Sequence, residues 1–236
     1  MTSRHSAMFE ALKLITLATP LAGAAREDFR QALQGATAAL PAVRRYLLEP
    51  VLPGGYDAGD LIWRVSFADE QTGRRALAER PWRDVDAQLL GDHGRVARIE
   101  HAAWTRAAGG GVSPGRGVYR VALFCANRSP SPERLARFAA ETRAMPQYIR
   151  SIRSWQLATT CEASGSRPWT HVWQQEYSDL DGLAGTYMMH PWHWAHVDRW
   201  FDPEWPEWLV DPVLCHAFCA SPAPVIEPCT SVVDPP

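Results

Sequence analysis

Runs of alternating apolar and polar residues, typical of strands, and runs with helical spacing follow one another in a regular order along this chain. In the second half, residues 118–126 alternate as a partly buried strand does. Ser131 and Pro132 are typical of the N-cap and first position of a helix, which we expect to end before Pro146. Further strands are expected over residues 152–160, 169–177 and 213–220, and further helices over residues 179–189 and 193–201. The expected order in this half is β-α-β-β-α-β, with a hairpin turn near Gly165.

The first half of the chain carries the same pattern. After a strand expected over residues 9–18, the segment LIWRVSF at residues 61–67 precedes a helix and a Pro-Trp pair that begins at Pro81. In the second half, HVWQQEY at residues 171–177 precedes a helix and a Pro-Trp pair that begins at Pro191. Both features are offset by 110 positions, and a constant offset of this kind indicates an internal duplication.

A glycine-rich stretch, AAGGGVSPGRG at residues 107–117, lies between the two copies. It has no apolar period and predicts a linker. We therefore expect an N-terminal unit over residues 1–106 and a C-terminal unit over residues 118–236. The predicted fold class is α+β: two tandem ferredoxin-like βαββαβ units bury the apolar faces of their sheets against each other and form an intramolecular, pseudo-dimeric α+β barrel.

Composition narrows the classes of function. The 236 residues carry a formal net charge of −2 and no run of Lys or Arg, so nucleic acid is not an expected partner. No apolar run of about 18 residues occurs, so no membrane partner is expected either. The five cysteines contain no Cys-x-x-Cys pair and are expected to be reduced thiols, which predicts a cytoplasmic protein. Because fused units satisfy each other's sheet contact, we expect a monomer or a homodimer.

Tryptophan is concentrated in the second half of the chain. Seven of the eleven tryptophans lie between Trp169 and Trp208. A tryptophan side chain brings a large apolar area with few rotatable bonds, so such clusters form cores, interfaces or flat aromatic pockets. The cluster is therefore compatible with a pocket for an aromatic small molecule as well as with a contact between the two halves.

One motif in the second half carries chemistry. Tyr187 and His193 stand in the segment YMMHPWH at the end of a predicted helix, and His171 stands in THV at the start of the preceding strand. These segments, together with Asp198, resemble the signature of the stress-responsive A/B barrel (Dabb) family of the dimeric α/β barrel superfamily, in particular a plant polyketide-cyclising member. The resemblance implies that Tyr187 and His193 are catalytic and that His171 lies in the pocket.

The N-terminal copy lacks these groups. Its equivalent motif reads RPWR at residues 80–83, Leu77 stands in place of Tyr187, and Leu61 stands in place of His171. The Pro-Trp pair persists, whereas every candidate catalytic side chain is absent. This asymmetry predicts a first copy kept for structure and a second copy kept for chemistry.

Alternation along the strand at residues 171–177 assigns side chains to two faces. One face carries four candidate lining residues, namely His171, Trp173, Gln175 and Tyr177. On the first strand of this half a second set shares a face, namely Tyr119, Val121 and Leu123. We expect both sets to line the interior of the barrel, where polar and aromatic groups would orient a ring substrate.

The chemistry of the motif follows from its residue types. An imidazole exchanges a proton near neutral pH, and a tyrosine hydroxyl beside it can relay that proton or donate to an oxyanion. We expect Tyr187 and His193 to remove a proton beside a carbonyl and to stabilise the enolate, while His171 orients the substrate. The predicted substrate-binding residues are Trp173, Gln175, Tyr119, Trp192 and His196. Since no glycine-rich nucleotide loop occurs, no cofactor is expected.

Other histidines have different interpretations. His190 is expected to form a hydrogen bond at a helix end, and His216 on the last strand is a further candidate for the pocket. His190, His193, His196 and Asp198 are permitted metal ligands, but no convergent strand residue completes the set. We therefore expect no metal.

Three functions remain open from the sequence. The first is a cofactor-independent lyase, cyclase or isomerase that uses Tyr-His acid–base chemistry on an aromatic or polyketide-like carbonyl compound. The second is a haem- or metal-dependent enzyme, or a cofactor-free oxygenase, of the same superfamily. The third is a stress-related protein that binds a small ligand without catalysis. The fold does not decide among them, because this superfamily supports several chemistries.

Overall fold

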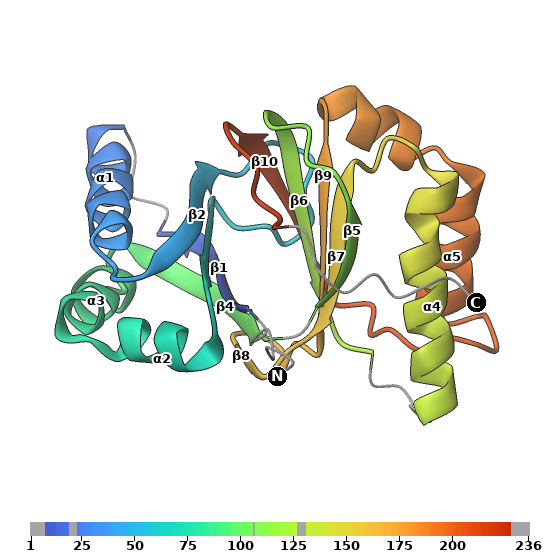
Figure 1. Cartoon of the computed structure of the whole chain (residues 1–236), viewed down its shortest axis with the longest axis horizontal. Helices are drawn as coiled ribbons and strands as arrows, with labels where there is room; N and C mark the ends of the chain where they lie inside the picture. Colours follow the sequence, from blue (N-terminus) through green and yellow to red (C-terminus); the bar gives the residue numbers. More distant parts are fainter. Residues whose placement is uncertain (1–7, 19–22, 106, 127–130, 228–236) are drawn as a thin grey trace, which may run out of the picture.

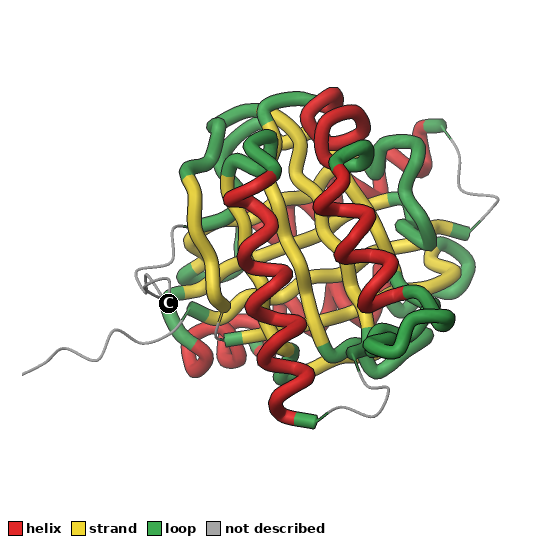
Figure 2. Tube along the Cα trace, turned by 90° about the vertical axis from the view of Figure 1, so that its right-hand side faces the viewer, coloured by secondary structure: helices red, strands yellow, loops and turns green. Residues whose placement is uncertain are grey.

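The structure is a computed structural model that describes residues 8–18, 23–105, 107–126 and 131–227. Two antiparallel five-stranded sheets face each other at the centre, and helices cover the outer face of each sheet (Figure 1). In the view of Figure 2, two helices lie side by side over one sheet while the strands of the other sheet cross behind. No helix in the described ranges is long and apolar enough to span a membrane.

The N-terminal unit has the predicted βαββαβ order. Its elements are β1 (Phe9–Leu17), α1 (Ala24–Ala38), β2 (Val43–Pro50), β3 (Leu61–Phe67), α2 (Glu70–Ala78), α3 (Arg80–Val85), the π-helical η1 (Asp86–Leu90) and β4 (Val96–Trp104). The four strands pair in the order β2-β3-β1-β4. The helices of this unit lie on the outer side of its sheet (Figure 1).

The C-terminal unit repeats this arrangement. Its elements are β6 (Gly117–Phe124), α4 (Pro132–Tyr148), β7 (Ser154–Thr159), β9 (His171–Tyr177), the π-helical η2 (Gly182–Tyr187), α5 (Pro191–Phe201) and β10 (Cys215–Ser221). The strands pair in the order β10-β6-β9-β7, which matches the order of the first unit. Two ferredoxin-like units with facing sheets confirm the predicted fold class.

The strand registers identify equivalent positions in the two units. Ala11 on β1 lies opposite Val65 on β3, and Arg120 on β6 lies opposite Gln175 on β9. Val65 and Gln175 are equivalent in the repeat, since they share its offset of 110 positions. Ala11 therefore occupies, in the N-terminal unit, the place that Arg120 occupies in the C-terminal unit.

The two units also exchange short edge strands, which the sequence did not predict. β5 (Ala107–Gly111) lies within the expected linker and pairs with β7, whereas β8 (Glu162–Ser164), beside the expected turn at Gly165, pairs with β4. Glycine makes the first pairing possible, because a Cβ at Gly110 would lie only 3.3 Å from the indole nitrogen of Trp155. A backbone without side chains can pack under that ring.

Helix α4 begins as predicted and ends later than predicted. The hydroxyl of Ser131 accepts a hydrogen bond from the backbone N–H of Arg134 at 3.2 Å, which confirms the N-cap. The helix nevertheless continues through Pro146 to Tyr148. Proline removes only its own N–H, and in the last turn that loss does not stop the following residues from remaining helical.

Apolar side chains from both sheets pack the interior of the barrel. They include Leu12, Leu14, Ile62, Val121, Leu123 and Val172. Closure also involves the loop between β2 and β3, because the backbone of Tyr56 exchanges two hydrogen bonds with that of His216 on β10, at 2.9 and 2.7 Å. This loop ties the N-terminal unit to the edge of the C-terminal sheet.

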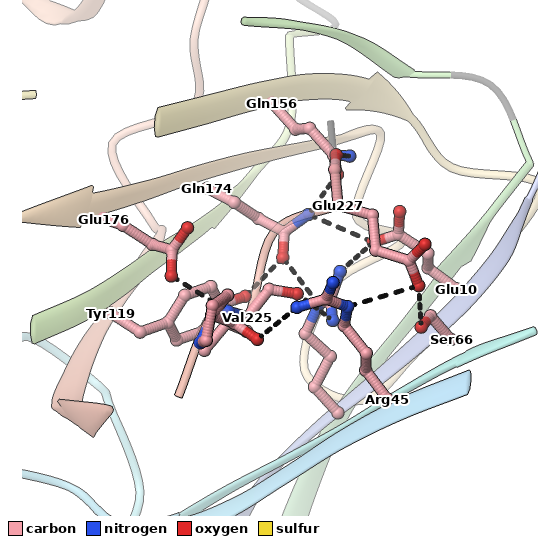
Figure 3. A network of polar contacts seen from close by, with 11 residues as sticks. Glu10, Arg45, Ser66, Tyr119, Gln156, Gln174, Glu176, Val225 and Glu227 are labelled. Atoms are coloured by element: carbon pink, nitrogen blue, oxygen red, sulfur yellow. Dashed lines mark hydrogen bonds and ion pairs between the residues drawn. The ribbon is translucent and has the colours of Figure 1, made fainter. Parts of the chain in front are cut away.

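A buried polar network crosses this interior (Figure 3). The guanidinium of Arg64 lies 2.5 Å from a carboxylate oxygen of Glu10 and donates to the side-chain oxygen of Gln174 at 2.9 Å. The hydroxyl of Tyr119 donates to the same Gln174 oxygen. Arg64 also donates to the backbone oxygen of Val225 at 2.9 Å, so the chain beyond β10 becomes part of the network. These contacts occupy the region where we predicted a substrate.

The predicted face of β9 is therefore wrong, whereas Tyr119, Val121 and Leu123 of β6 face the barrel interior as predicted. Gln174 and Val172 face the interior together with Tyr119, whereas Trp173 and Tyr177 face the helices. All seven residues of β9 are buried, so both faces of the strand are covered. Alternation separates the two faces, but it does not tell which one meets the helices and which one meets the other sheet.

Candidate active site between the C-terminal sheet and its helices

A cavity of about 310 Å³ lies between the C-terminal sheet and its helices. This volume is at the lower end of the roughly 300–1,000 Å³ that small-molecule pockets usually have. The sheet contributes Arg120, Ala122, Phe124, Trp173 and His216 to the lining. The helices contribute Phe138, Thr142, Met145, Tyr187, His193, His196, Val197 and Phe201. The wall is mostly apolar, with a few polar groups among the aromatic rings.

Tyr187 and His193 meet in this cavity. Their ring centroids lie 4.4 Å apart, and both side chains are buried. Tyr187 ends η2, and Pro191 begins α5 shortly afterwards. The imidazole of His190 accepts a hydrogen bond from the backbone N–H of Trp192 at 3.1 Å, which confirms the predicted role of His190 at a helix end. The capped and proline-initiated helix holds His193 against the phenol ring.

The histidines of the cavity are held in the neutral form. Burial, followed by the positive charge of Arg120, lowers the pKa of His193 to about 3. The same two causes, in the same order, lower the pKa of His216 to about 2. Burial lowers the pKa of His196 to about 4, and its Nε2 lies 3.2 Å from the hydroxyl of Thr142. At neutral pH these imidazoles can accept or donate hydrogen bonds without carrying charge.

Arg120 supplies a fixed positive charge to the same cavity. Its side chain is buried at 8% exposure, and its guanidinium carbon lies 5.5 Å from the centroid of the Tyr187 ring. One guanidinium nitrogen donates to the side-chain oxygen of Gln175 at 2.8 Å. Among the carboxylates in the described ranges, none forms an ion pair with Arg120. The cavity is thus electropositive as well as apolar.

Several buried polar atoms around the cavity have no hydrogen-bond partner within the described protein. They are Arg120 Nε, Trp173 Nε1, Gln175 Nε2, Tyr177 Oη, His193 Nδ1, His196 Nδ1 and His216 Nε2. Buried polar groups in native proteins are nearly always paired, and each exception requires an explanation. A concentration of such atoms around one cavity favours a polar ligand there.

The structure brings only some of the predicted site residues together. Tyr187, His193, Trp173 and His196 line the cavity. His171 lies outside the lining: its ring stacks on Phe124 at 5.4 Å. The prediction that His171 orients the substrate therefore has no support in this geometry.

Three predicted substrate-binding residues have other positions. Tyr119 lies on the opposite face of the sheet, in the barrel interior. Trp192 stacks on Tyr148 of α4, with centroids 3.8 Å apart, and is absent from the lining. Gln175 is also absent from the lining, but it contacts the cavity indirectly because it holds the guanidinium of Arg120. Strand alternation did not distinguish a residue in the wall from a residue behind it.

Sequence reasoning missed most of the apolar lining of the cavity, and it also missed Arg120 and Tyr56. Arg120 is the single charged residue of β6, whose segment reads GVYRVALF, and this lone charge in an apolar strand was the available signal. Tyr56 reaches the cavity from the loop between β2 and β3 of the N-terminal unit, and its side chain is 59% exposed. No local pattern marks Tyr56, because its position depends on how the two units pack.

One group of potential metal ligands occurs in the described ranges, and none of its members lines this cavity. Asp57, Glu100 and Cys215 place ligand atoms within 4.8 Å of one another. Arg98 forms a bidentate contact with Asp57 and lies 3.4 Å from Glu100. A guanidinium thus already balances these carboxylates, and burial raises the pKa of the Cys215 thiol. The arrangement is an ion-pair cluster that joins the two units.

Two solved structures share the complete two-unit architecture. An anthrone oxidase-like protein is 10% identical, with 91% of each chain covered and a TM-score of 0.62. A mutant chlorite dismutase from Candidatus Nitrospira defluvii in complex with cyanide is 14% identical, with 92% of each chain covered and a TM-score of 0.55. At these identities the likeness shows the fold alone. The class is therefore a single-chain, two-unit α/β barrel protein.

The family is recognised in the C-terminal unit. The model of the stress responsive A/B barrel domain, Dabb, matches residues 118–211, which include nearly all of β6 and the whole cavity-lining helix α5. This part of the C-terminal unit thus matches a Dabb domain, as its motif predicted. No curated protein matches the chain.

Proposed function

We propose that this protein is an enzyme that transfers protons, without a cofactor, on an aromatic or polyketide-like carbonyl compound bound in the cavity. Tyr187 and His193 would be its catalytic residues. The observation that carries the proposal is their convergence, 4.4 Å apart, on one mostly apolar cavity. Trp173 and His196 would contact the substrate, since they line the same cavity.

The proposed reaction begins with a proton transfer from carbon to nitrogen. The neutral imidazole of His193 takes a proton from the carbon beside a carbonyl group, and the electron pair of the broken C–H bond forms an enolate. The hydroxyl of Tyr187 donates a hydrogen bond to the enolate oxygen. The imidazolium then returns the proton to another carbon, which gives an isomer, or to an oxygen formed when the enolate attacks a second carbonyl, which gives a ring.

The sequence supports the same roles. The segment from Tyr187 to His193 resembles that of olivetolic acid cyclase, a plant polyketide cyclase of the Dabb family, in which the Tyr and the second His are catalytic. We transfer catalytic roles from that enzyme to Tyr187 and His193 alone, because His171 does not line the cavity. We also propose, from composition and the fused architecture, a cytoplasmic monomer or homodimer.

Haem is not needed for this chemistry. Among the candidate haem ligands, His190 caps α5 and Nε2 of His196 lies beside the hydroxyl of Thr142, whereas Nδ1 of His193 has no partner in the described protein. No step through haem is therefore part of this proposal.

Deuterium exchange tests the proposed function without knowledge of the natural substrate. Acetophenone is incubated in D₂O with the protein, and loss of the methyl proton signal is followed by NMR. We expect catalysed exchange that falls about 10²- to 10⁴-fold in His193→Ala and about 10²-fold in Tyr187→Phe. Exchange that is absent in the parent, or unchanged in His193→Ala, would contradict the proposal and favour a ligand-binding protein without catalysis. Oxygen uptake in the same samples would reveal an oxygenase.

A further inference from the structure

We infer that the ligand of this cavity carries a carboxylate, and that Arg120 binds it. This inference rests on the proposed function only in taking the cavity as the ligand site. It adds a substrate class, aromatic carboxylates, and a specificity-determining residue that the motif does not contain.

A buried charge without a partner destabilises the folded protein. An arginine remains charged in a protein, and removing a charge from water is costly unless an opposite charge or several hydrogen bonds compensate. Arg120 is buried at 8% exposure, yet its one hydrogen bond within the described chain goes to the neutral side chain of Gln175. A bound anion would supply the missing compensation.

A second arginine in the same molecule shows what a structural solution looks like. Arg64 is buried completely, and its guanidinium pairs with Glu10 at 2.5 Å, with Gln174 at 2.9 Å and with a backbone oxygen. The chain has thus provided a carboxylate for the buried arginine of its barrel interior. Within the described ranges, no carboxylate pairs with Arg120 in this way.

The free edge of Arg120 suits a carboxylate. Gln175 engages Nη1, whereas Nε has no partner in the described protein. The edge formed by Nε and Nη2 is one of the two guanidinium edges that bind a carboxylate through two parallel hydrogen bonds. The guanidinium also lies beside the Tyr187 ring, with 5.5 Å between its carbon and the ring centroid. An anion held there would lie within the cavity and next to the proposed catalytic pair.

The electrostatics of the cavity agree with an anionic ligand. Arg120 contributes, after burial, to the low pKa of His193 and His216. A carboxylate paired with Arg120 would offset that positive charge and raise both pKa values, which would make His193 a stronger base when substrate is bound. The groups facing His193 include Tyr187, Arg120 and His196, and no carboxylate of the described chain lines the cavity.

The internal repeat indicates that the fold does not require an arginine at this position. Ala11 occupies the position of Arg120 in the N-terminal unit, on the same strand of the same sheet order. Val65 likewise occupies the position of Gln175, which holds the guanidinium. The unit without the histidine motif therefore also lacks the arginine and its supporting amide.

A matched pair of probes tests the inference. Binding of 4-acetylbenzoate and of its neutral amide, 4-acetylbenzamide, is measured by isothermal titration calorimetry. We expect the parent protein to bind the acid about tenfold or more tightly than the amide, and Arg120→Met to remove this preference. Arg137→Met is the control, because that exposed arginine already has Glu141 as a partner at 3.0 Å.

Stability measurements separate a binding role from a structural one. Replacing a buried charge that lacks a partner with an apolar side chain is neutral or stabilising, so Arg120→Met is expected to unfold at the same or higher urea concentration than the parent. If that variant fails to fold, Arg120→Lys keeps the charge without the planar fork, and we expect it to retain a reduced preference for the acid. A histidine pKa that rises on binding 4-acetylbenzoate, measured by NMR, is a further expected result.

Several outcomes would overturn the inference. They are equal binding of acid and amide by the parent, no measurable binding of either probe, or an acid preference that survives in Arg120→Met. The proposed function is tested by a different measurement, so it and the inference can fail independently. A clear acid preference without deuterium exchange would leave a carboxylate-binding protein that is not an enzyme, whereas exchange of acetophenone without any acid preference would leave an enzyme in which Arg120 has another role.

Discussion

The two units of this chain share one fold but differ in what fills the space between sheet and helices. In the N-terminal unit, Trp82 stacks on Trp63 with ring centroids 4.8 Å apart and an angle of 16° between the planes. In the C-terminal unit, the equivalent Trp192 stacks on Tyr148 of α4, and Trp173 lines the cavity. The position of one indole ring thus differs between the two copies, and in the C-terminal copy a cavity lies beside Trp173.

The polar residues follow the same division. Where the C-terminal unit has Arg120 and Gln175, the N-terminal unit has Ala11 and Val65, and all four side chains are buried. Apolar residues at these positions stabilise a unit, whereas the polar ones require desolvation and leave atoms without partners. A duplicated chain can keep one copy for stability and reserve the other for a ligand.

The largest expected difference between the units concerns their equivalent tryptophans. Trp63→Ala should lower the free energy of unfolding by about 3–5 kcal/mol, because it removes a fully buried ring. Its indole N–H also donates to Thr37 at 2.8 Å. Trp173→Ala should cost about 1–3 kcal/mol, since that ring already borders a cavity and its N–H has no partner in the described protein.

Urea denaturation of both variants measures this difference. Equal losses, or a larger loss in Trp173→Ala, would show that the C-terminal unit is packed as tightly as the N-terminal unit. Retained near-ultraviolet circular dichroism in both variants would confirm that each is folded before denaturation.

A smaller effect is expected from pH. The unfolded chain protonates His193 near pH 6.5, whereas burial and Arg120 lower the pKa of the folded state to about 3. Between these values the unfolded state binds more protons, so stability decreases as the pH falls. Lowering the pH from 6.5 to 5 should cost up to about 2 kcal/mol through this histidine. Denaturation of the parent and of His193→Gln at both pH values measures it, and identical pH slopes would refute the expectation.

A matched pair of threonines sharpens the comparison further. Thr37 and Thr142 are equivalent in the repeat, since each lies four residues before a proline, Pro41 and Pro146. Thr37 accepts a hydrogen bond from Trp63, and Thr142 lies 3.2 Å from Nε2 of His196. Both hydroxyls also donate to the backbone four residues earlier. We expect a loss of about 1–3 kcal/mol in Thr37→Val and about 1 kcal/mol in Thr142→Val, because His196 borders the cavity. Thermal unfolding of the two variants measures these losses. If the cavity were closed, Thr142→Val would lose more stability than Thr37→Val.

The smallest effect on stability should come from Tyr56. Its side chain is mostly exposed, and its contacts with His216 use the backbone. Tyr56→Ala should therefore change the free energy of unfolding by less than about 0.5 kcal/mol. Because Tyr56 lines the cavity, the same variant should weaken binding of 4-acetylbenzoate several-fold. Unchanged binding would show that the N-terminal unit contributes nothing to the site.

Much of the fold could be predicted because its signals are local or repeated. Periodicity located the strands, Ser131 and Pro132 marked the start of α4, and the constant offset exposed the duplication. The exchange of β5 and β8 could not be predicted in this way. Each of these short strands pairs with a distant part of the chain, and their sequences carry no apolar pattern.

The candidate site was predicted in part. The spacing of Tyr187 and His193 around Pro191 anticipated their contact, since a helix end and a proline-initiated helix determine it locally. The face of β9 that meets the helices was wrong, because both faces are buried and equally compatible with alternation. Arg120 was missed because a lone charge in a strand resembles a residue at a solvated edge, and only the packing of α5 reveals that it is buried.

A crystal structure of the protein with 4-acetylbenzoate tests most directly the claim that chemistry is confined to one copy. We expect density for the ligand between the C-terminal sheet and α5, with its carboxylate on Arg120 and its ketone beside Tyr187 and His193. Density in the barrel interior near Arg64, or between the sheet and helices of the N-terminal unit, would contradict it.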